Sequence, residues 1–273
     1  MAGQQVRHRT LTNGMEVQAW GSGPRTLLFI PGGPGSGLPR GMSGRLARRW
    51  FAPFVQAGYA VHYVTRRRNM PSGHTVADMA DDYAQAIDED LDGRVDLVVG
   101  ESYGGMIAQY LAARHPDRWR DLAIVVAAAE VSEWGKDVDT RAAAALAAGD
   151  PAQAGRIFAE YVLPGERSRW VRRLAGPLVA RSLLSGASYP PADVLVETRA
   201  ELAFDARPVL ADIGSRVILL CGDRDQFFPI DLVEETARLI PECTLVRYEG
   251  QGHMRVASSR RVVHDVLGFV ARR

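Results

Sequence analysis

One stretch of the sequence decides the expected fold: Val95-Asp-Leu-Val-Val-Gly100-Glu101-Ser102-Tyr103-Gly104-Gly105. Its first part is a short run of apolar, mostly β-branched residues, which predicts a buried strand. The second part has the pattern G-x-S-x-G, and the residues that follow it, Met106–Arg114, have helical spacing. The stretch therefore predicts a strand, a sharp turn that presents Ser102, and a helix.

Similar apolar runs recur on both sides of this stretch. They are Thr26–Ile30, Ala60–Thr65, Leu122–Val126, Val217–Cys221 and Thr244–Tyr248. The runs are solid rather than alternating, which is typical of strands that helices cover on both faces. Near the start of the chain, Val6–Leu11 and Met15–Trp20 flank Asn13-Gly14, a strong hairpin signal. We therefore predict an α/β domain with a mostly parallel central sheet, helices on both faces and an N-terminal antiparallel hairpin at its edge.

Residues 130–208 interrupt this alternation and have helical patterns only. The expected helices are Arg141–Ala148, Pro151–Tyr161, Ser168–Leu184 and Pro191–Phe204. We predict that this segment is a helical lid inserted between two strands, so that residues 1–129 and 209–273 form the core domain. The alternative is an ordinary long connection.

The composition limits the class of protein. Hydrophobic residues make up 47% and charged residues 24%, which is ordinary for a globular protein. Lys and Arg number 33 against 32 Asp and Glu, so no strong field favours nucleic acid or an anionic membrane. The two cysteines imply no disulfide framework, and we find neither a signal-peptide pattern nor a membrane-spanning run. We expect a cytoplasmic monomer or homodimer without cofactor, metal, nucleic acid or membrane insertion.

The glycine-rich turn around Ser102 suits nucleophilic chemistry. A serine on a sharp strand-to-helix turn projects its hydroxyl clear of the sheet, and the helix N-terminus favours negative charge beside it. Pro31-Gly32-Gly33-Pro34-Gly35 follows another strand. Because this loop has few side chains, its backbone amides can approach a substrate oxygen closely. The alternative is a plain Gly-Pro turn.

An acid and a histidine follow the last two predicted strands. Asp223 and Asp225 come after Val217–Cys221, and His253 follows Thr244–Tyr248 within Gly250-Gln-Gly-His-Met254. Parallel sheets assemble sites at the carboxyl ends of their strands, so a carboxylate here can orient a histidine that acts as a general base. Either aspartate could instead cap the next helix. We interpret the other five histidines as structural.

The order serine, aspartate, histidine resembles the α/β-hydrolase superfamily, and the match covers nearly the whole chain outside the lid. The resemblance implies that Ser102 is the nucleophile, His253 the general base and Asp225 the acid. Gly222, Asp225 and Pro229 fit the family's acid motif, whereas Asp223 fits it less well. It also implies small-molecule substrates.

The Gly-Gly-Pro-Gly loop is similar to that of proline iminopeptidases and esterase-like relatives. This resemblance implies that the backbone N–H groups of Gly33 and Tyr103 form an oxyanion hole. Pro31 stands where the group usually has a histidine that supports the loop. The basic run Thr65–Pro71, with Arg66, Arg67 and Arg68, lies where relatives have an Arg-Gly-rich loop. It could attract an anionic substrate, or it could be a solvated surface that braces neighbouring loops.

The lid supplies the candidates for substrate contacts. Trp170, Leu174 and Leu178 have helical spacing, and we expect some of these apolar residues to pack on the core and some to line an acyl pocket. An aminopeptidase would need an acidic clamp for the substrate amine. Four residues could form one, and the sequence selects none of them: Glu130, Glu133, Glu197 and Glu201.

We therefore expect a hydrolase that cleaves a small-molecule ester, lactone or thioester through an acyl-enzyme on Ser102. The alternatives are an aminopeptidase or amidase of the proline iminopeptidase type, and a cofactor-independent lyase, cyclase or carbon–carbon hydrolase with the same triad. A further alternative is a small-molecule receptor on a hydrolase scaffold, because fold does not fix function.

Overall fold

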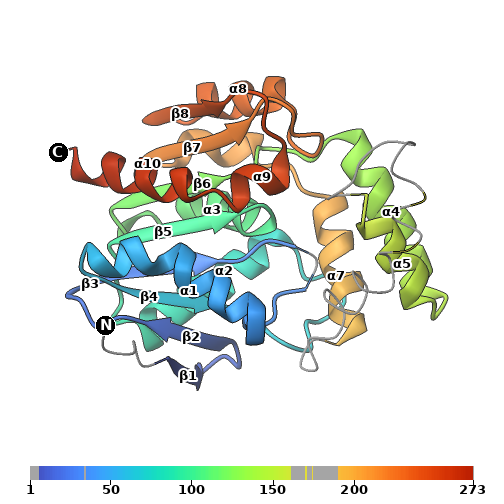
Figure 1. Cartoon of the computed structure of the whole chain (residues 1–273), viewed down its shortest axis with the longest axis horizontal. Helices are drawn as coiled ribbons and strands as arrows, with labels where there is room; N and C mark the ends of the chain where they lie inside the picture. Colours follow the sequence, from blue (N-terminus) through green and yellow to red (C-terminus); the bar gives the residue numbers. More distant parts are fainter. Residues whose placement is uncertain (1–5, 34, 161–169, 171–173, 175–189, 273) are drawn as a thin grey trace.

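The structure, a computed structural model, describes residues 6–33, 35–160, 170, 174 and 190–272. At its centre is an eight-stranded sheet with the order β1-β2-β4-β3-β5-β6-β7-β8 (Figure 1). The strands are β1 Arg7–Thr10, β2 Glu16–Trp20, β3 Arg25–Ile30, β4 Tyr59–Val64, β5 Leu97–Glu101, β6 Asp121–Val125, β7 Arg216–Gly222 and β8 Cys243–Tyr248. All the strands expected from the sequence are present.

The pairing within the sheet confirms the predicted hairpin. Strand β1 pairs antiparallel with β2, and β2 pairs antiparallel with β4, whereas β4, β3, β5, β6, β7 and β8 are parallel neighbours. In the hairpin turn, Gly14 has a φ of 84°, a conformation that glycine adopts without strain. The Leu11 N–H donates to the Met15 carbonyl at 2.7 Å, which closes the turn.

Helices cover both faces of the sheet (Figure 1). On one face lie α1 Gly41–Gln56, α9 His253–Ala257 and α10 Arg260–Ala271; on the other lie α2 Val76–Asp90, α3 Tyr103–Arg114 and α8 Ile230–Leu239. Neighbouring residues of β5 point to opposite faces of the sheet. Val98 packs in the core under α2 and α3, and Val99 packs in the core under α1 and α10. Both are fully buried, as the solid apolar run predicts.

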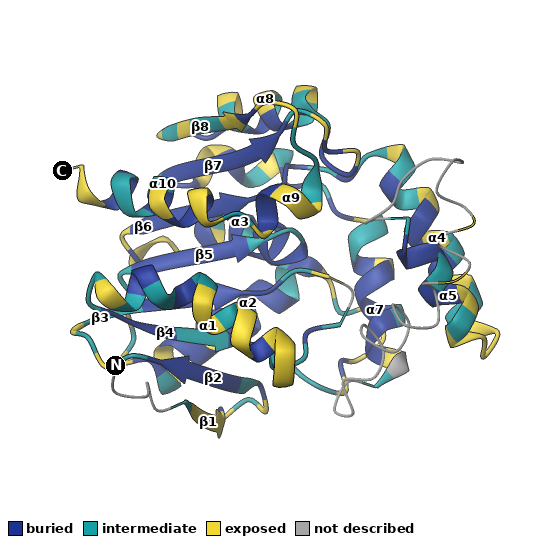
Figure 2. Ribbon diagram, in the orientation of Figure 1, coloured by how far each residue is buried: buried dark blue, intermediate teal, exposed yellow. Residues whose placement is uncertain are grey.

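The segment between β6 and β7 forms a separate group of helices beside the carboxyl ends of the strands (Figure 1). It contains α4 Glu133–Ala147, α5 Pro151–Phe158 and α7 Pro191–Leu202. We call this group the inserted helices. All three helices have buried positions (Figure 2). Val138 on α4 and Ile157 and Phe158 on α5 form a small core of their own, whereas Val196 and Ala200 on α7 belong to the core of the sheet.

Two residues of the apolar set in this segment are exposed. Trp170 and Leu174 are 68% and 74% exposed, so neither is buried against the core, and their contact with a substrate stays a prediction. Leu178 and most of the expected helix Ser168–Leu184 lie outside the described residues. Within the described part of the chain, no helix combines the length and the apolar character needed to cross a bilayer.

Candidate active site

Ser102 lies on a strained turn between β5 and α3. Its φ of 52° and ψ of −117° place a non-glycine residue where L-amino acids are rarely found. The flanking glycines are required because the turn is crowded. A Cβ at Gly104 would lie 2.0 Å from the Ile30 carbonyl oxygen, and one at Gly100 would lie 2.5 Å from the Gly104 carbonyl oxygen. The G-x-S-x-G pattern therefore follows from close packing of strand, turn and helix.

The side chains of Ser102, His253 and Asp225 form one chain of hydrogen bonds. The Ser102 Oγ lies 3.0 Å from His253 Nε2, and His253 Nδ1 lies 2.7 Å from Asp225 Oδ2. The Asp225 carboxylate is buried, and its other oxygen accepts the N–H groups of Phe227 at 2.9 Å and Phe228 at 3.2 Å. These bonds hold the carboxylate in one orientation toward the imidazole.

Asp223, the weaker candidate for the acid, has a different set of contacts. It accepts the N–H of Gly250 at 2.7 Å and lies 3.5 Å from the Arg247 guanidinium. Asp223 thus holds the loop that leads to His253, whereas Asp225 contacts the histidine itself. The sequence separates the two aspartates by only two positions, but the turn after β7 gives each a separate partner.

The surroundings of His253 are largely apolar. The rings of Phe227 and Phe228 lie 5.3 and 5.9 Å from the imidazole ring. Glu101, next to Ser102, is a polar neighbour that the sequence interpretation missed. Burial raises the pKa of the Glu101 carboxyl to about 7, and the neighbouring His253 imidazole partly offsets this effect. A carboxyl group with a near-neutral pKa therefore lies beside the serine.

The loop after β3 packs directly against the serine turn. A Cβ at Gly32 would lie 2.9 Å from the Ser102 Cβ, so only glycine fits there. Gly33 has a φ of 81°, which again suits glycine. Tyr103 is the first residue of α3, at the positive end of the helix dipole. The two backbone segments expected to hold an oxyanion thus both lie next to Ser102.

The basic run after β4 braces neighbouring loops. Arg68 lies 2.6 Å from Glu16, Arg67 lies 3.2 Å from Asp82, and Arg66 pairs with Glu197. The bracing interpretation is therefore confirmed, but a solvated surface is wrong for Arg66, which is 1% exposed. The sequence does not predict the burial of Arg66, because nothing in the run distinguishes it from Arg67 and Arg68.

The four possible amine clamps all have partners. Glu130 contacts Lys136 and Arg207, and Glu133 also contacts Lys136. The carboxylate of Glu197 pairs with Arg66 and also accepts the N–H of Gly35 at 2.6 Å. Glu201 shares a hydrogen bond with Asp139 on α4.

The mostly parallel sheet, the strained serine turn and the residues after β7 and β8 define a class of protein, the α/β hydrolases. The family profile described as "alpha/beta hydrolase fold" matches residues 25–256. The chain belongs to this family.

The names of two sequence relatives agree with this class. "Putative carbamate hydrolase RutD" of Caulobacter vibrioides is 30% identical over 210 residues, 73% of each chain. "Pimeloyl-[acyl-carrier protein] methyl ester esterase" of Chromobacterium violaceum is 28% identical over 87% of this chain and 90% of its own. Among solved structures, an esterase from Exiguobacterium antarcticum has a TM-score of 0.73 at 17% identity, covering 98% of this chain and 100% of its own. At this identity the solved structure is evidence for the fold only. The two sequence relatives are named as a hydrolase and an esterase.

Proposed function

We propose that this protein is a serine hydrolase that cleaves a small-molecule carboxylic ester, lactone or thioester through an acyl-enzyme on Ser102. The observation that carries the proposal is the hydrogen-bond chain from Ser102 Oγ through His253 to Asp225. This arrangement of alcohol, imidazole and buried carboxylate performs acyl transfer on several unrelated folds, so the inference depends on the site as well as on the fold.

The geometry assigns each group a step. Because His253 Nδ1 donates to Asp225, its Nε2 is available to take the Ser102 proton as Oγ attacks the acyl carbon. The N–H groups of Gly33 and Tyr103 stabilise the negative oxygen that forms. His253 then gives its proton to the leaving alcohol or thiol. Water attacks the acyl-enzyme by the same route in reverse, and the carboxylic acid leaves.

Ester-like bonds are favoured over amides by the contacts of the inserted helices. An aminopeptidase needs a carboxylate available for the substrate amine, and each of the four candidate glutamates already contacts a charged or acidic side chain of the protein. The name of one relative, a methyl ester esterase, supports the same preference. We further propose that residues 130–208 form a cap that selects the acyl group.

Labelling with a serine-directed fluorophosphonate tests the nucleophile. We expect one adduct, on Ser102. We also expect turnover of activated esters in a substrate panel that varies the acyl chain length and compares methyl esters, thioesters, carbamates and amides. Ser102→Ala should lose turnover by a factor on the order of 10⁴ while staying folded, because the covalent route is removed. Ser43→Ala, at an exposed serine of α1, is the matched control and should behave as the native protein.

Three results would contradict the proposal in different ways. An adduct on another residue would reject Ser102 as the nucleophile. Turnover without any covalent acyl-enzyme, sought by rapid quenching and mass spectrometry, would favour a lyase or carbon–carbon hydrolase. Tight ligand binding with turnover far slower than ligand dissociation would favour a receptor.

A further inference from the structure

We propose that the buried Arg66–Glu197 ion pair positions the peptide N–H of Gly33 for the oxyanion and makes that position depend on helix α7. Both members are positioning residues and neither touches the reacting atoms. The proposal rests on the proposed function, since it assigns the support of one donor in the same site.

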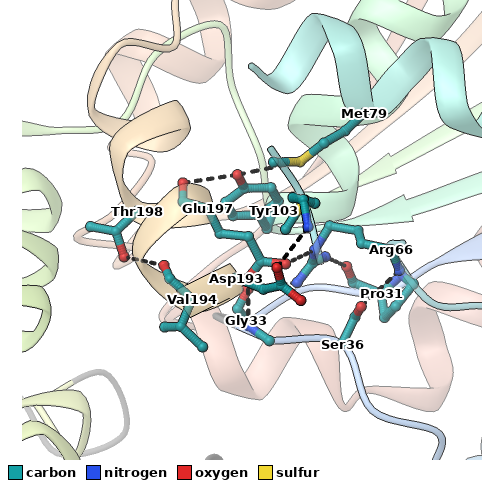
Figure 3. Close-up of polar contacts among 12 residues, drawn as sticks. Pro31, Gly33, Ser36, Arg66, Met79, Tyr103, Asp193, Val194, Glu197 and Thr198 are labelled. Atoms are coloured by element: carbon teal, nitrogen blue, oxygen red, sulfur yellow. Dashed lines mark hydrogen bonds and ion pairs between the residues drawn. The ribbon is translucent and has the colours of Figure 1, made fainter. Parts of the chain in front are cut away.

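Arg66 fixes the loop on both sides of the Gly33 N–H. Its guanidinium donates to the Pro31 carbonyl at 2.8 Å and to the Gly33 carbonyl at 3.4 Å (Figure 3). Along the backbone, the Gly33 N–H lies between these two carbonyls, so fixing both restricts the peptide that carries it. The backbone N–H of Arg66 also donates to Ser36 Oγ at 2.7 Å, which anchors the far end of the loop.

Pro31 itself has no side-chain donor that could hold the loop. The guanidinium of Arg66, from the loop after β4, holds the Pro31 carbonyl. The loop after β3 is thus supported by a neighbouring element.

Glu197 connects the loop to the inserted helices. Its Oε1 accepts from Arg66 Nε, and its Oε2 accepts the Gly35 N–H at 2.6 Å. Both residues of the ion pair have side chains 1% exposed, so the interaction is little screened by water. The Glu197 carboxylate on α7 therefore accepts two hydrogen bonds. One comes from Gly35 in the loop after β3, and the other comes from Arg66, which supports that loop.

The second oxyanion segment is joined to the same helix. The Tyr103 hydroxyl donates to the Glu197 carbonyl at 2.9 Å, and the Arg66 guanidinium lies 4.6 Å from the centre of the Tyr103 ring. Asp193, one turn earlier on α7, accepts the N–H groups of Asn69 and Met70 at 2.9 and 2.8 Å. Displacing α7 would thus disturb the surroundings of both Gly33 and Tyr103.

The test uses variants that remove the pair in two ways. Glu197→Gln keeps the size but offers one acceptor to two donors, Arg66 Nε–H and Gly35 N–H. Arg66→Met with Glu197→Met replaces the whole pair by apolar groups, a change that leaves many proteins folded. The matched control is Glu130→Gln, which weakens two partly exposed ion pairs, with Lys136 and Arg207, without touching the loop.

With a small activated ester, we expect both pair variants to lose kcat by a factor on the order of 10², as when one oxyanion donor is removed, with KM little changed. Affinity for a trifluoromethyl ketone, which forms a tetrahedral adduct on Ser102, should fall by a similar factor. Affinity for a planar, unreactive analogue should not fall. The control should match the native protein in every assay.

Hydrogen exchange of the peptide that contains residues 31–35 provides a readout independent of turnover. Exchange should become faster in both pair variants and remain unchanged in Glu130→Gln. Folded pair variants with native kcat, or with native exchange in this loop, would overturn the proposal. If the native protein hydrolyses no ester, the proposed function fails, and native exchange in the variants would still refute the positioning role.

Discussion

Asp223 and Asp225 lie two residues apart, yet their contacts predict different losses on substitution. Asp225→Asn should lower kcat by a factor on the order of 10⁴, because an amide can donate to His253 Nδ1 and favour the wrong tautomer. Asp223→Asn should leave kcat near native and lower the free energy of unfolding by about 1 kcal/mol, because the Gly250 N–H keeps a weaker acceptor. Ester turnover and urea unfolding measure the two effects, and an exchange of phenotypes would contradict this assignment.

The same residues show what local pattern can predict. Ser102, His253 and the pair Asp223 and Asp225 could be found because each follows a predicted strand, and parallel strands bring their carboxyl ends together. Resemblance to the family's acid motif, rather than this local pattern, selected Asp225. The role of Arg66 could not be predicted, because its burial depends on contacts with Pro31 and Glu197, which are distant in sequence. Pairing between residues 66 and 197 is a property of the tertiary structure alone.

At the scale of elements, two acidic side chains join helices α4 and α7. Asp139 on α4 is 2% exposed and shares a hydrogen bond with Glu201 on α7, and among the described residues its Oδ2 has no partner. Burial raises the pKa of Asp139 to about 7, and burial together with repulsion from Asp139 raises the pKa of Glu201. The pair therefore holds a proton at pH values where free carboxyls are ionised.

This contact predicts how stability changes with pH. The pKa of Asp139 in the folded state lies above the unfolded value of about 3.9, so the folded state binds more protons in between. The free energy of unfolding should fall as pH rises from about 4 to above 7. Asp139→Asn should remove the cost of ionisation and raise Tm by a few degrees at pH 8, and by less at pH 5.

Thermal melts at the two pH values check this prediction. Asp137→Asn is the matched control, because Asp137 is an exposed residue on the same helix that pairs with Arg141. A native pH dependence in Asp139→Asn would show that the acid pair does not set the stability of these helices.

At the scale of the whole molecule, the sequence predicted the sheet better than the inserted helices. Solid apolar runs identify strands buried on both faces, and the Asn13-Gly14 turn identifies the antiparallel edge. The inserted helices have apolar faces too, but periodicity does not say which surface covers each face. Trp170 and Leu174 illustrate this limit, since their spacing was compatible with packing on the core or with lining a pocket, and both are exposed.

The position of β8 at the edge of the sheet predicts a second whole-molecule property. Among the described strands, β8 pairs with β7 alone, and most of its residues are partly exposed. His253, which lies 3.0 Å from Ser102 Oγ, follows β8 by only a short loop. We expect the midpoint of heat inactivation, followed by fluorophosphonate labelling, to lie a few degrees below the unfolding midpoint followed by circular dichroism. Coincident midpoints would contradict this.

We expect the attachment of His253 through an edge strand to give the molecule a reversible inactive form. Local opening of β8 and the following loop would withdraw the imidazole from Ser102 without unfolding the rest of the sheet. Such a form has an inert serine and an intact core, so activity would return on cooling without a complete folding reaction. The lifetime of activity at high temperature would then depend on how readily β8 returns to the sheet.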